Sequence, residues 1–234
     1  MRSHARVIVI GGGNMGVGVL YHLAKEGWTD CVLIEKDELT SGATWHAAGL
    51  VSRMVAGHAL GAIHDYAVDC YKSIEAETGQ SVSWHGCGSL RVATSPDHLD
   101  WIKHLYDAVH GRGQDAVMLD PQEVAALNPL YDTRAAGVIA GVYTPDDGHV
   151  DPAGACLALA GGARQMGAEI IRQCRVTGVS RLNTNEWAVD TEKGRLVGDH
   201  VVNAGGYHAR QIGALSGLDL PIVTLQHHYV VTED

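Results

Sequence analysis

The sequence lacks a long hydrophobic run, a paired-cysteine motif and an excess of basic residues. No stretch of about 18 consecutive apolar residues occurs, so no membrane-spanning helix and no membrane partner are expected. The five cysteines are scattered without a C-x-x-C pair, which favours reduced structural thiols. The formal net charge of -10 disfavours nucleic acid and anionic membranes as partners, because both bind basic surfaces.

Recognisable metal-binding motifs are also missing. The 14 histidines include no H-x-H or H-E-x-x-H pattern. His227 and His228 are adjacent on an expected strand, so their side chains would point to opposite faces. The prediction is therefore that no metal ion is bound.

A glycine-rich turn follows the first expected strand. The apolar run Val7–Ile10 predicts a buried strand, and the helical spacing of apolar residues after Gly16 predicts a helix. Between them, Gly11 permits a tight turn, Gly13 lets the backbone approach a pyrophosphate, and Gly16 allows close packing of helix on strand. The amides around Asn14 and Met15 would point at the phosphates. This order of elements is typical of a dinucleotide-binding unit.

A carboxylate ends the second expected strand. The strand Cys31–Ile34 runs into Glu35 and Lys36, at the distance from the glycines where an acidic side chain hydrogen-bonds a ribose hydroxyl. The same carboxylate would repel a 2′-phosphate, which disfavours NADP. Strand, glycines, helix, strand and acid together predict an α/β fold with a Rossmann-like domain.

Motifs spread along the chain resemble the flavin domain of the dimethylglycine and sarcosine dehydrogenase family, within the D-amino-acid-oxidase-like FAD-dependent oxidoreductases. The resemblance covers the chain from residue 6 to the end, and the Trp-His loop is its most specific part. The segments that carry it are Tyr21–Lys25, Leu39–Leu50, Asp147–Pro152, Val201–Gly206 and His228–Thr232.

The resemblance implies FAD as the cofactor, joined through its 8α-methyl group to a ring nitrogen of His46. A neutral imidazole is a suitable nucleophile for that position near pH 7. Around it, small and hydroxyl-bearing residues would supply donors to the pyrophosphate and ribityl chain and leave room for a flat ring. These loop residues are Thr40, Ser41, Gly42, Ala43, Thr44, Trp45, Ala47, Ala48, Gly49 and Leu50.

Four later residues complete the expected cofactor site. The resemblance places Val176 beside the adenine, although an ordinary strand valine is an equal alternative. Ala204 and Gly205 belong to a small-residue turn that would close over the cofactor. His208 matches a cofactor-contacting position, with a solvent-facing histidine at a helix start as the alternative.

The implied reaction is oxidation of a secondary or tertiary N-methyl amino acid, with a hydride equivalent passing to flavin N5. The resemblance places a strand, Leu225–Tyr229, on the substrate side. His227, His228 and Tyr229 are the candidate catalytic groups that would orient the amine and influence its pKa. A strand whose histidines face solvent is the alternative. Arg53 and Arg91 are candidates for binding the substrate carboxylate. The alternative is that they are ordinary surface cations.

The expected architecture is a Rossmann-like FAD-binding domain of the two-dinucleotide-domain flavoprotein type with an inserted mixed-sheet substrate lobe, truncated at the C-terminus. The FAD-binding domain would comprise residues 1–80 and 145–213, and the partial substrate lobe residues 81–144 and 214–234. Segments 169–171 and 174–176 would form one strand of the nucleotide sheet. A folate-binding region found in relatives would be missing, so little turnover is expected from this chain alone.

Three functions stay open from the sequence. The chain is an amine dehydrogenase or oxidase with FAD tethered at His46, an enzyme of the same fold with dissociable FAD, or a non-catalytic nucleotide-binding subunit of a split flavoenzyme. The electron acceptor would be oxygen or an electron-transfer flavoprotein. Because the first strand begins by residue 7, no targeting peptide is expected, which suggests a prokaryotic cytoplasm or, for a processed chain, the mitochondrial matrix.

Overall fold

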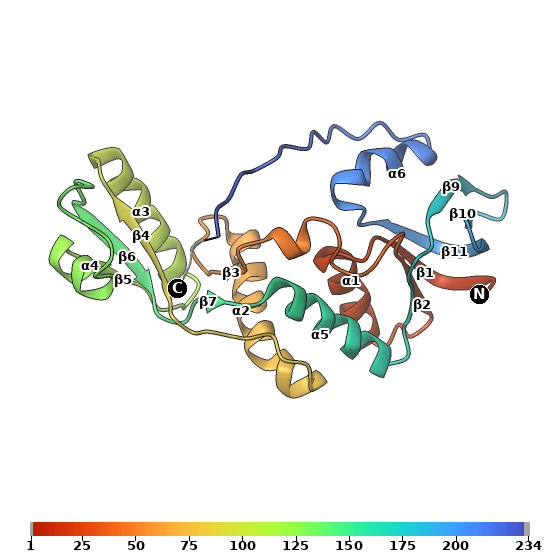
Figure 1. The fold of residues 1–234 in the computed structure, drawn as a ribbon, viewed down its shortest axis with the longest axis horizontal. Helices are drawn as coiled ribbons and strands as arrows, with labels where there is room; N and C mark the ends of the chain where they lie inside the picture. Colours follow the sequence, from red (N-terminus) through yellow and green to blue (C-terminus); the bar gives the residue numbers. More distant parts are fainter. Residues whose placement is uncertain (1, 232–234) are drawn as a thin grey trace. The chain divides into compact units, whose positions relative to one another are not determined.

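The computed structural model describes residues 2–231, which divide into two compact units (Figure 1). The first unit joins the segment up to His46 with the segment from Cys156 onward, and the second is Ala47–Ala155. Helix α5, Pro152–Gln165, begins in the second unit and continues into the first. Among the described residues, no helix combines the length and the apolar character needed to cross a membrane.

The first unit is built on one six-stranded mixed sheet, with strand order β8-β2-β1-β11-β10-β9. Strands β8, β2, β1 and β11 are parallel neighbours, whereas β10 pairs antiparallel with β11 and with β9. The elements of this unit are β1 (His4–Ile10), α1 (Asn14–Lys25), β2 (Cys31–Ile34), η1 (Thr44–His46), β8 (Glu169–Ile171), β9 (Val176–Arg181), β10 (Trp187–Thr191), β11 (Gly194–Asn203), η2 (Gly206–His208) and α6 (Ala209–Leu215).

The core of this unit lies around β1 and β2. All four residues of β2 are buried, and so are five of the seven residues of β1. Helix α1 buries one stripe, Gly16, Val17, Leu20, Tyr21 and Ala24, at the spacing of a helix face. These observations confirm the predicted strand-turn-helix-strand order and the α/β fold class.

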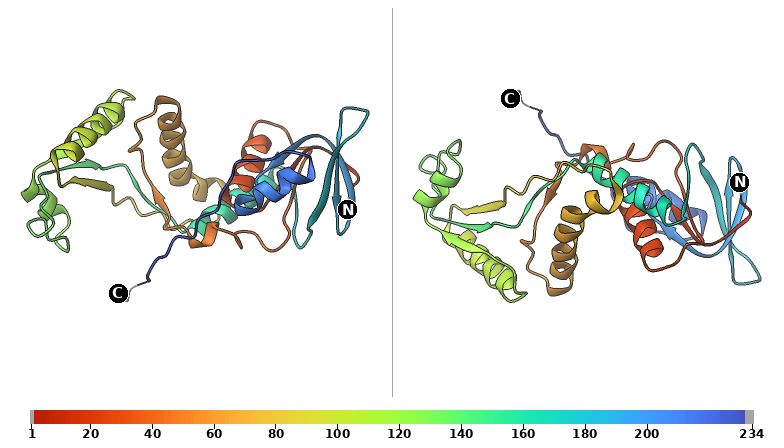
Figure 2. Two further views of the ribbon diagram at one scale, coloured as in Figure 1. Left: turned by 90° about the horizontal axis from the view of Figure 1, so that it is seen from above. Right: turned by 90° about the horizontal axis from the view of Figure 1, so that it is seen from below.

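The second unit contains a three-stranded antiparallel sheet with order β4-β6-β5, and Figure 2 shows α3 and α4 on either side of it. Ile102 and Val109 of α3 pack with Ala93 and Val142 of the sheet, all fully or almost fully buried. The elements are β3 (Leu50–Val51), α2 (His58–Thr78), β4 (Ser89–Ala93), α3 (Pro96–His110), β5 (Val117–Leu119), α4 (Pro121–Leu127), β6 (Ala140–Thr144) and β7 (Gly148–His149).

Two expectations about strands are wrong. Segments 169–171 and 174–176 do not form one strand, because Glu169–Ile171 is β8 and Val176 begins β9, at opposite edges of the sheet. Leu225–Tyr229 lies in a stretch without helix or strand, although its residues favour β structure. A strand requires a hydrogen-bonded neighbour, and no described strand pairs with this segment. The argument that alternation turns only one of His227 and His228 inward therefore does not hold.

Candidate functional site

Two hollows of about 240 and 180 Å³ lie in the first unit, where β1 and β2 end. They share five lining residues, so they form one continuous groove along the carboxyl ends of these parallel strands. Ligands of open α/β sheets bind at such an edge. The shared residues are Gly11, Glu35, Lys36, Gly205 and His208, all of them predicted cofactor-binding positions.

The glycine turn brings backbone against backbone at the floor of the groove. Gly11 has φ +117°, a conformation that favours glycine, and a Cβ there would overlap the carbonyl oxygen of Ala204. A Cβ on Gly16 would overlap the carbonyl oxygen of Gly11, which explains how α1 packs so closely on β1. The structural roles predicted for Gly11 and Gly16 are thus confirmed.

The start of α1 differs in one respect from the expectation. Gly13 is the N-cap residue and offers no side-chain cap, whereas the amide of Asn14 donates to the hydroxyl of Thr44 over 3.0 Å. The backbone amide of Asn14 is therefore already hydrogen-bonded within the protein, because the loop that contains Thr44, 30 residues further along the chain, supplies the acceptor. Met15 is 75% exposed and lines the smaller hollow.

Glu35 is buried and accepts two backbone hydrogen bonds. Its Oε2 accepts from the amide of Gly12 over 2.6 Å, and its Oε1 accepts from the amide of Asp37 over 2.8 Å. These bonds hold the carboxylate at the wall shared by the two hollows. Lys36 bonds Asp37, which raises the pKa of Lys36 and lowers that of Asp37. The Lys36 ammonium is thus already paired with a protein anion.

A buried thiol lies beneath the same turn. Cys156 of α5 has its Sγ 3.7 Å from the carbonyl oxygen of Gly12, to which it donates. Burial, and secondarily the charge of Glu35, raises the pKa of Cys156 to about 12. The thiol is therefore protonated at neutral pH, in agreement with the expectation of a structural cysteine.

The larger hollow is closed by one face of α6. Gln211, Ile212 and Leu215 of α6 line it with His208 and with Val176, the first residue of β9. The three α6 residues were not predicted to line the site, although positions 208, 211, 212 and 215 follow the i, i+3, i+4, i+7 spacing of one helix face. Arg175, another lining residue, was not predicted either.

The loop after Glu35 lines the smaller hollow. Ser41, Gly42, Ala43 and Thr44 are all part of its wall, together with Ala204 of the turn after β11. Thr40 turns the loop with φ 70°, and its amide donates to the carbonyl of Gly12 over 3.1 Å. Tyr207 also lines this hollow. Sequence reasoning passed over Tyr207, since nothing local marks it as a lining residue.

His46 ends the short helix η1, next to the loop that lines the smaller hollow. Its ring is exposed and lies 3.8 Å, centroid to centroid, from the ring of Trp45, which is itself 55% exposed. The Nδ1 atom of His46 is 2.9 Å from the hydroxyl of Tyr229. The structure therefore brings one predicted catalytic residue to the predicted tether.

The remaining loop residues, Ala47, Ala48, Gly49 and Leu50, belong to the second unit. Gly49 has φ +77°, and a Cβ there would overlap the carbonyl oxygen of Val150. Leu50 pairs with His149 between β3 and β7 and is 79% exposed. Within this unit, Gly49 thus has a clear structural role, because the close approach of Val150 leaves no space for a side chain.

The other candidates have different surroundings. His227 and His228 are exposed. Arg53 is 3% exposed and pairs with Asp69 over 2.7 Å, so the structure assigns it to a buried ion network. Arg91 lies over the ring of Trp101, 5.5 Å from its centroid. The structure thus makes Arg53 an unsuitable carboxylate ligand.

Comparison with known proteins gives consistent relatives. The chain is 40% identical to the mitochondrial dimethylglycine dehydrogenase of Homo sapiens and 37% identical to the mitochondrial sarcosine dehydrogenase of the same organism, over 99% of this chain and 26% of each relative. It thus spans about a quarter of the length of these curated relatives. The crystal structure of L-proline dehydrogenase from P. horikoshii superimposes with a TM-score of 0.87 at 28% identity, over 95% of this chain and 58% of that chain. The family model DAO, FAD dependent oxidoreductase, matches residues 6–234, and the chain belongs to this family.

Proposed function

We propose that this chain forms the FAD-binding part of an enzyme that oxidises N-methyl amino acids, with the flavin tethered at His46. The observation that carries the proposal is the continuous groove of the first unit, which runs from Val176 to Thr44, two residues before His46. The substrate class follows from the names of the two relatives, dimethylglycine dehydrogenase and sarcosine dehydrogenase.

The residues of the groove fit an FAD molecule. Its floor is a glycine turn, and Gly13 lines the smaller hollow without a side chain, so a phosphate can approach the main chain closely there. The exposed start of α1 and the hydroxyl of Ser41 supply donors for a pyrophosphate. At the other end, Val176 and Ile212 provide apolar contacts for a flat base, while Glu35 offers its carboxylate to a ribose.

The proposed tether is a bond between a ring nitrogen of His46 and the 8α-methyl carbon of FAD. The imidazole is exposed, and its Nδ1 atom bonds Tyr229, which orients the ring. The ring of Trp45 lies beside it, tilted by 35°. An exposed imidazole, oriented by a hydrogen bond and close to the end of the cofactor groove, suits such an attachment.

FAD supplies the electron-accepting chemistry for amine oxidation. The polar groups His227, His228 and Tyr229 are proposed to orient the amine of an N-methyl amino acid and to hold it in its neutral form. Tyr229 is the best placed of the three, because its hydroxyl lies beside His46. Oxygen or an electron-transfer flavoprotein would accept the electrons.

The test is to incubate the purified chain with FAD, precipitate it with acid and look for flavin fluorescence on a denaturing gel. We expect a fluorescent band for the wild type and for His98→Ala, which removes another exposed histidine. His46→Ala should lose the band while keeping FAD that acid releases.

Two other results would change the proposal. Acid-released flavin from the wild type, with no fluorescent band, would support a dissociable cofactor instead of a tether. A folded chain that binds FAD in neither form, even at high FAD concentration, would contradict the cofactor assignment itself.

A further inference from the structure

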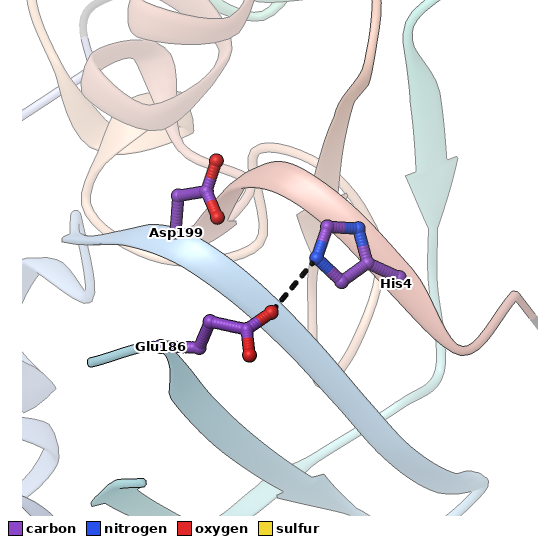
Figure 3. Close-up of side chains that lie close together, drawn as sticks. All are labelled: His4, Glu186 and Asp199. Atoms are coloured by element: carbon purple, nitrogen blue, oxygen red, sulfur yellow. Dashed lines mark hydrogen bonds and ion pairs between the residues drawn. The ribbon is translucent and has the colours of Figure 1, made fainter. Parts of the chain in front are cut away.

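Three side chains with metal-ligating atoms meet at the sheet end remote from the cofactor groove. Figure 3 shows His4 of β1, Glu186 just before β10 and Asp199 of β11 pointing toward one another. One ligand atom from each residue lies within 4.8 Å of the other two. His4 begins β1 and Ile10 ends it, so roughly 20 Å of strand separates this cluster from the groove.

The strand registers place these residues together. His4 is the pairing partner of Val197 on β11, so Asp199, two residues further, shares the sheet face of His4. Trp187 pairs with Gly198 at the end of the β10–β11 ladder, so the residues next to this pair, Glu186 and Asp199, lie near each other. The pairing of β1 with β11 and of β11 with β10 therefore brings the three residues of the cluster together.

The donor set and its spacing suit a zinc ion. Imidazole nitrogen and carboxylate oxygen bind Zn²⁺ at about 2.0–2.2 Å in tetrahedral geometry, which places two ligand atoms roughly 3.3 Å apart. His4 Nε2 and Glu186 Oε1 are 3.2 Å apart. Three protein ligands leave the fourth position to water, as expected for a partly exposed site.

The cluster holds two carboxylates and one imidazole. Glu186 stands one residue before β10, and Asp199 follows Gly198, the residue that pairs with Trp187. Glu186 pairs with His4 and is also hydrogen-bonded to the side chain of Thr184, whereas no ion pair within residues 2–231 involves Asp199. A divalent cation could contact both carboxylates and the imidazole at once.

We propose that His4, Glu186 and Asp199 bind one Zn²⁺ ion that joins β1, β10 and β11 at this end of the sheet. The ion would stabilise the first unit without taking part in chemistry at the cofactor groove. The sequence offered no sign of it, because 182 residues separate His4 from Glu186 and the set has no local spacing motif.

The experiment measures zinc binding by the purified chain, with and without FAD, using isothermal titration and thermal unfolding. We expect one zinc ion per chain and a higher Tm when zinc is present. His4→Gln and Asp199→Asn should each weaken binding at least about tenfold, the smallest loss typical of disturbed metal sites. His104→Gln, which removes an exposed histidine of α3, should bind zinc as the wild type does.

Circular dichroism and FAD binding check that the variants fold, and Glu186→Gln provides a third ligand change. Equal zinc affinity in the wild type and in all three ligand variants would overturn the proposal, because the bound zinc would then lie elsewhere. No zinc binding by the wild type would overturn it as well. Neither result bears on FAD binding, so the proposed function is tested separately.

Discussion

At the cofactor groove of the first unit, backbone packs directly against backbone, whereas a buried ion network around Arg112 joins segments of the second unit. Gly11 and Gly16 bring β1, α1 and the turn after β11 together with no room for a Cβ. In the second unit, the guanidinium of Arg112 bonds Asp65 over 2.9 Å and donates to the carbonyls of Val55 and Arg53. These two regions therefore depend on different kinds of interaction.

This contrast has a functional reason in the first unit. A cofactor groove made of main-chain atoms keeps its amides at fixed positions, because glycine leaves no side chain between backbone and ligand. The ion network of the second unit is made of side chains instead, and the side chains of Asp65 and Arg112 are 14% and 6% exposed. Buried ion pairs specify geometry through side chains, and they are costly to break singly.

The largest effect is expected from breaking the ion network of the second unit. Arg112→Met leaves Asp65 with a buried charge that has lost its closest partner, and it should lower the free energy of unfolding by about 3–5 kcal/mol. Arg134→Met, at an exposed position, should change it by less than about 0.5 kcal/mol. Chemical denaturation measures both, and hydrogen exchange should rise mainly within Ala47–Ala155. If Arg112→Met lowered the free energy of unfolding no more than Arg134→Met does, the ion network would not hold the second unit together.

A smaller loss of stability is expected from the backbone contact of the first unit. Gly16→Ala places a methyl group against the carbonyl of Gly11 and should cost about 3 kcal/mol while weakening FAD binding. Gly18→Ala, in the same helix, meets nothing within 4 Å and should stabilise by up to about 1 kcal/mol. Thermal unfolding and FAD titration distinguish the two, and equal behaviour of the pair would rule out the steric argument.

Helix caps give a third comparison. In the second unit, Asp120 caps α4 through the amides of Gln122 and Glu123, whereas α1 in the first unit has Gly13 and no side-chain cap. Asp120→Ala should therefore cost about 1 kcal/mol in chemical denaturation. Asp115→Ala, just upstream and outside any helix, is the control and should be neutral. A neutral Asp120→Ala would show that α4 is held by packing alone.

The smallest effect concerns the buried thiol of the first unit. The folded pKa of Cys156 is about 12 against a reference of 9.0, so the unfolded chain loses its proton first and stability falls as pH rises between these values. At pH 9.5 the loss is less than about 1 kcal/mol. Cys156→Ala should lose less stability than the wild type between pH 7 and 9.5. Parallel pH curves for the two proteins would show that burial does not shift this thiol.

Much of the first unit was predictable because its signals are local. The run Val7–Ile10, the glycines and Glu35 each specify a strand, a turn or a strand end within a few residues, and β1, α1 and β2 appear as expected. The start of α3 is also encoded locally, since the side chain of Ser95 caps the helix and Pro96 occupies its first turn. Such features depend on periodicity, capping and φ preferences.

Other features depend on partners that local sequence does not name. Leu225–Tyr229 has the composition of a strand but no paired neighbour in the described chain, and the amide of Asn14 is taken by Thr44. Arg53 could have been a surface cation until the fold surrounded it with carboxylates.

The sequence by itself determined the strand-glycine-helix unit, its acidic strand end and the family that the Trp-His loop indicates. Only the tertiary structure decided that α6 closes the groove through Gln211 and Ile212, that Tyr229 lies beside His46, and that His4 meets Glu186 and Asp199. The physical reason is that backbone conformation and amphipathic spacing are encoded over a few residues. Contacts between distant residues exist only after strand pairing and burial have brought them together.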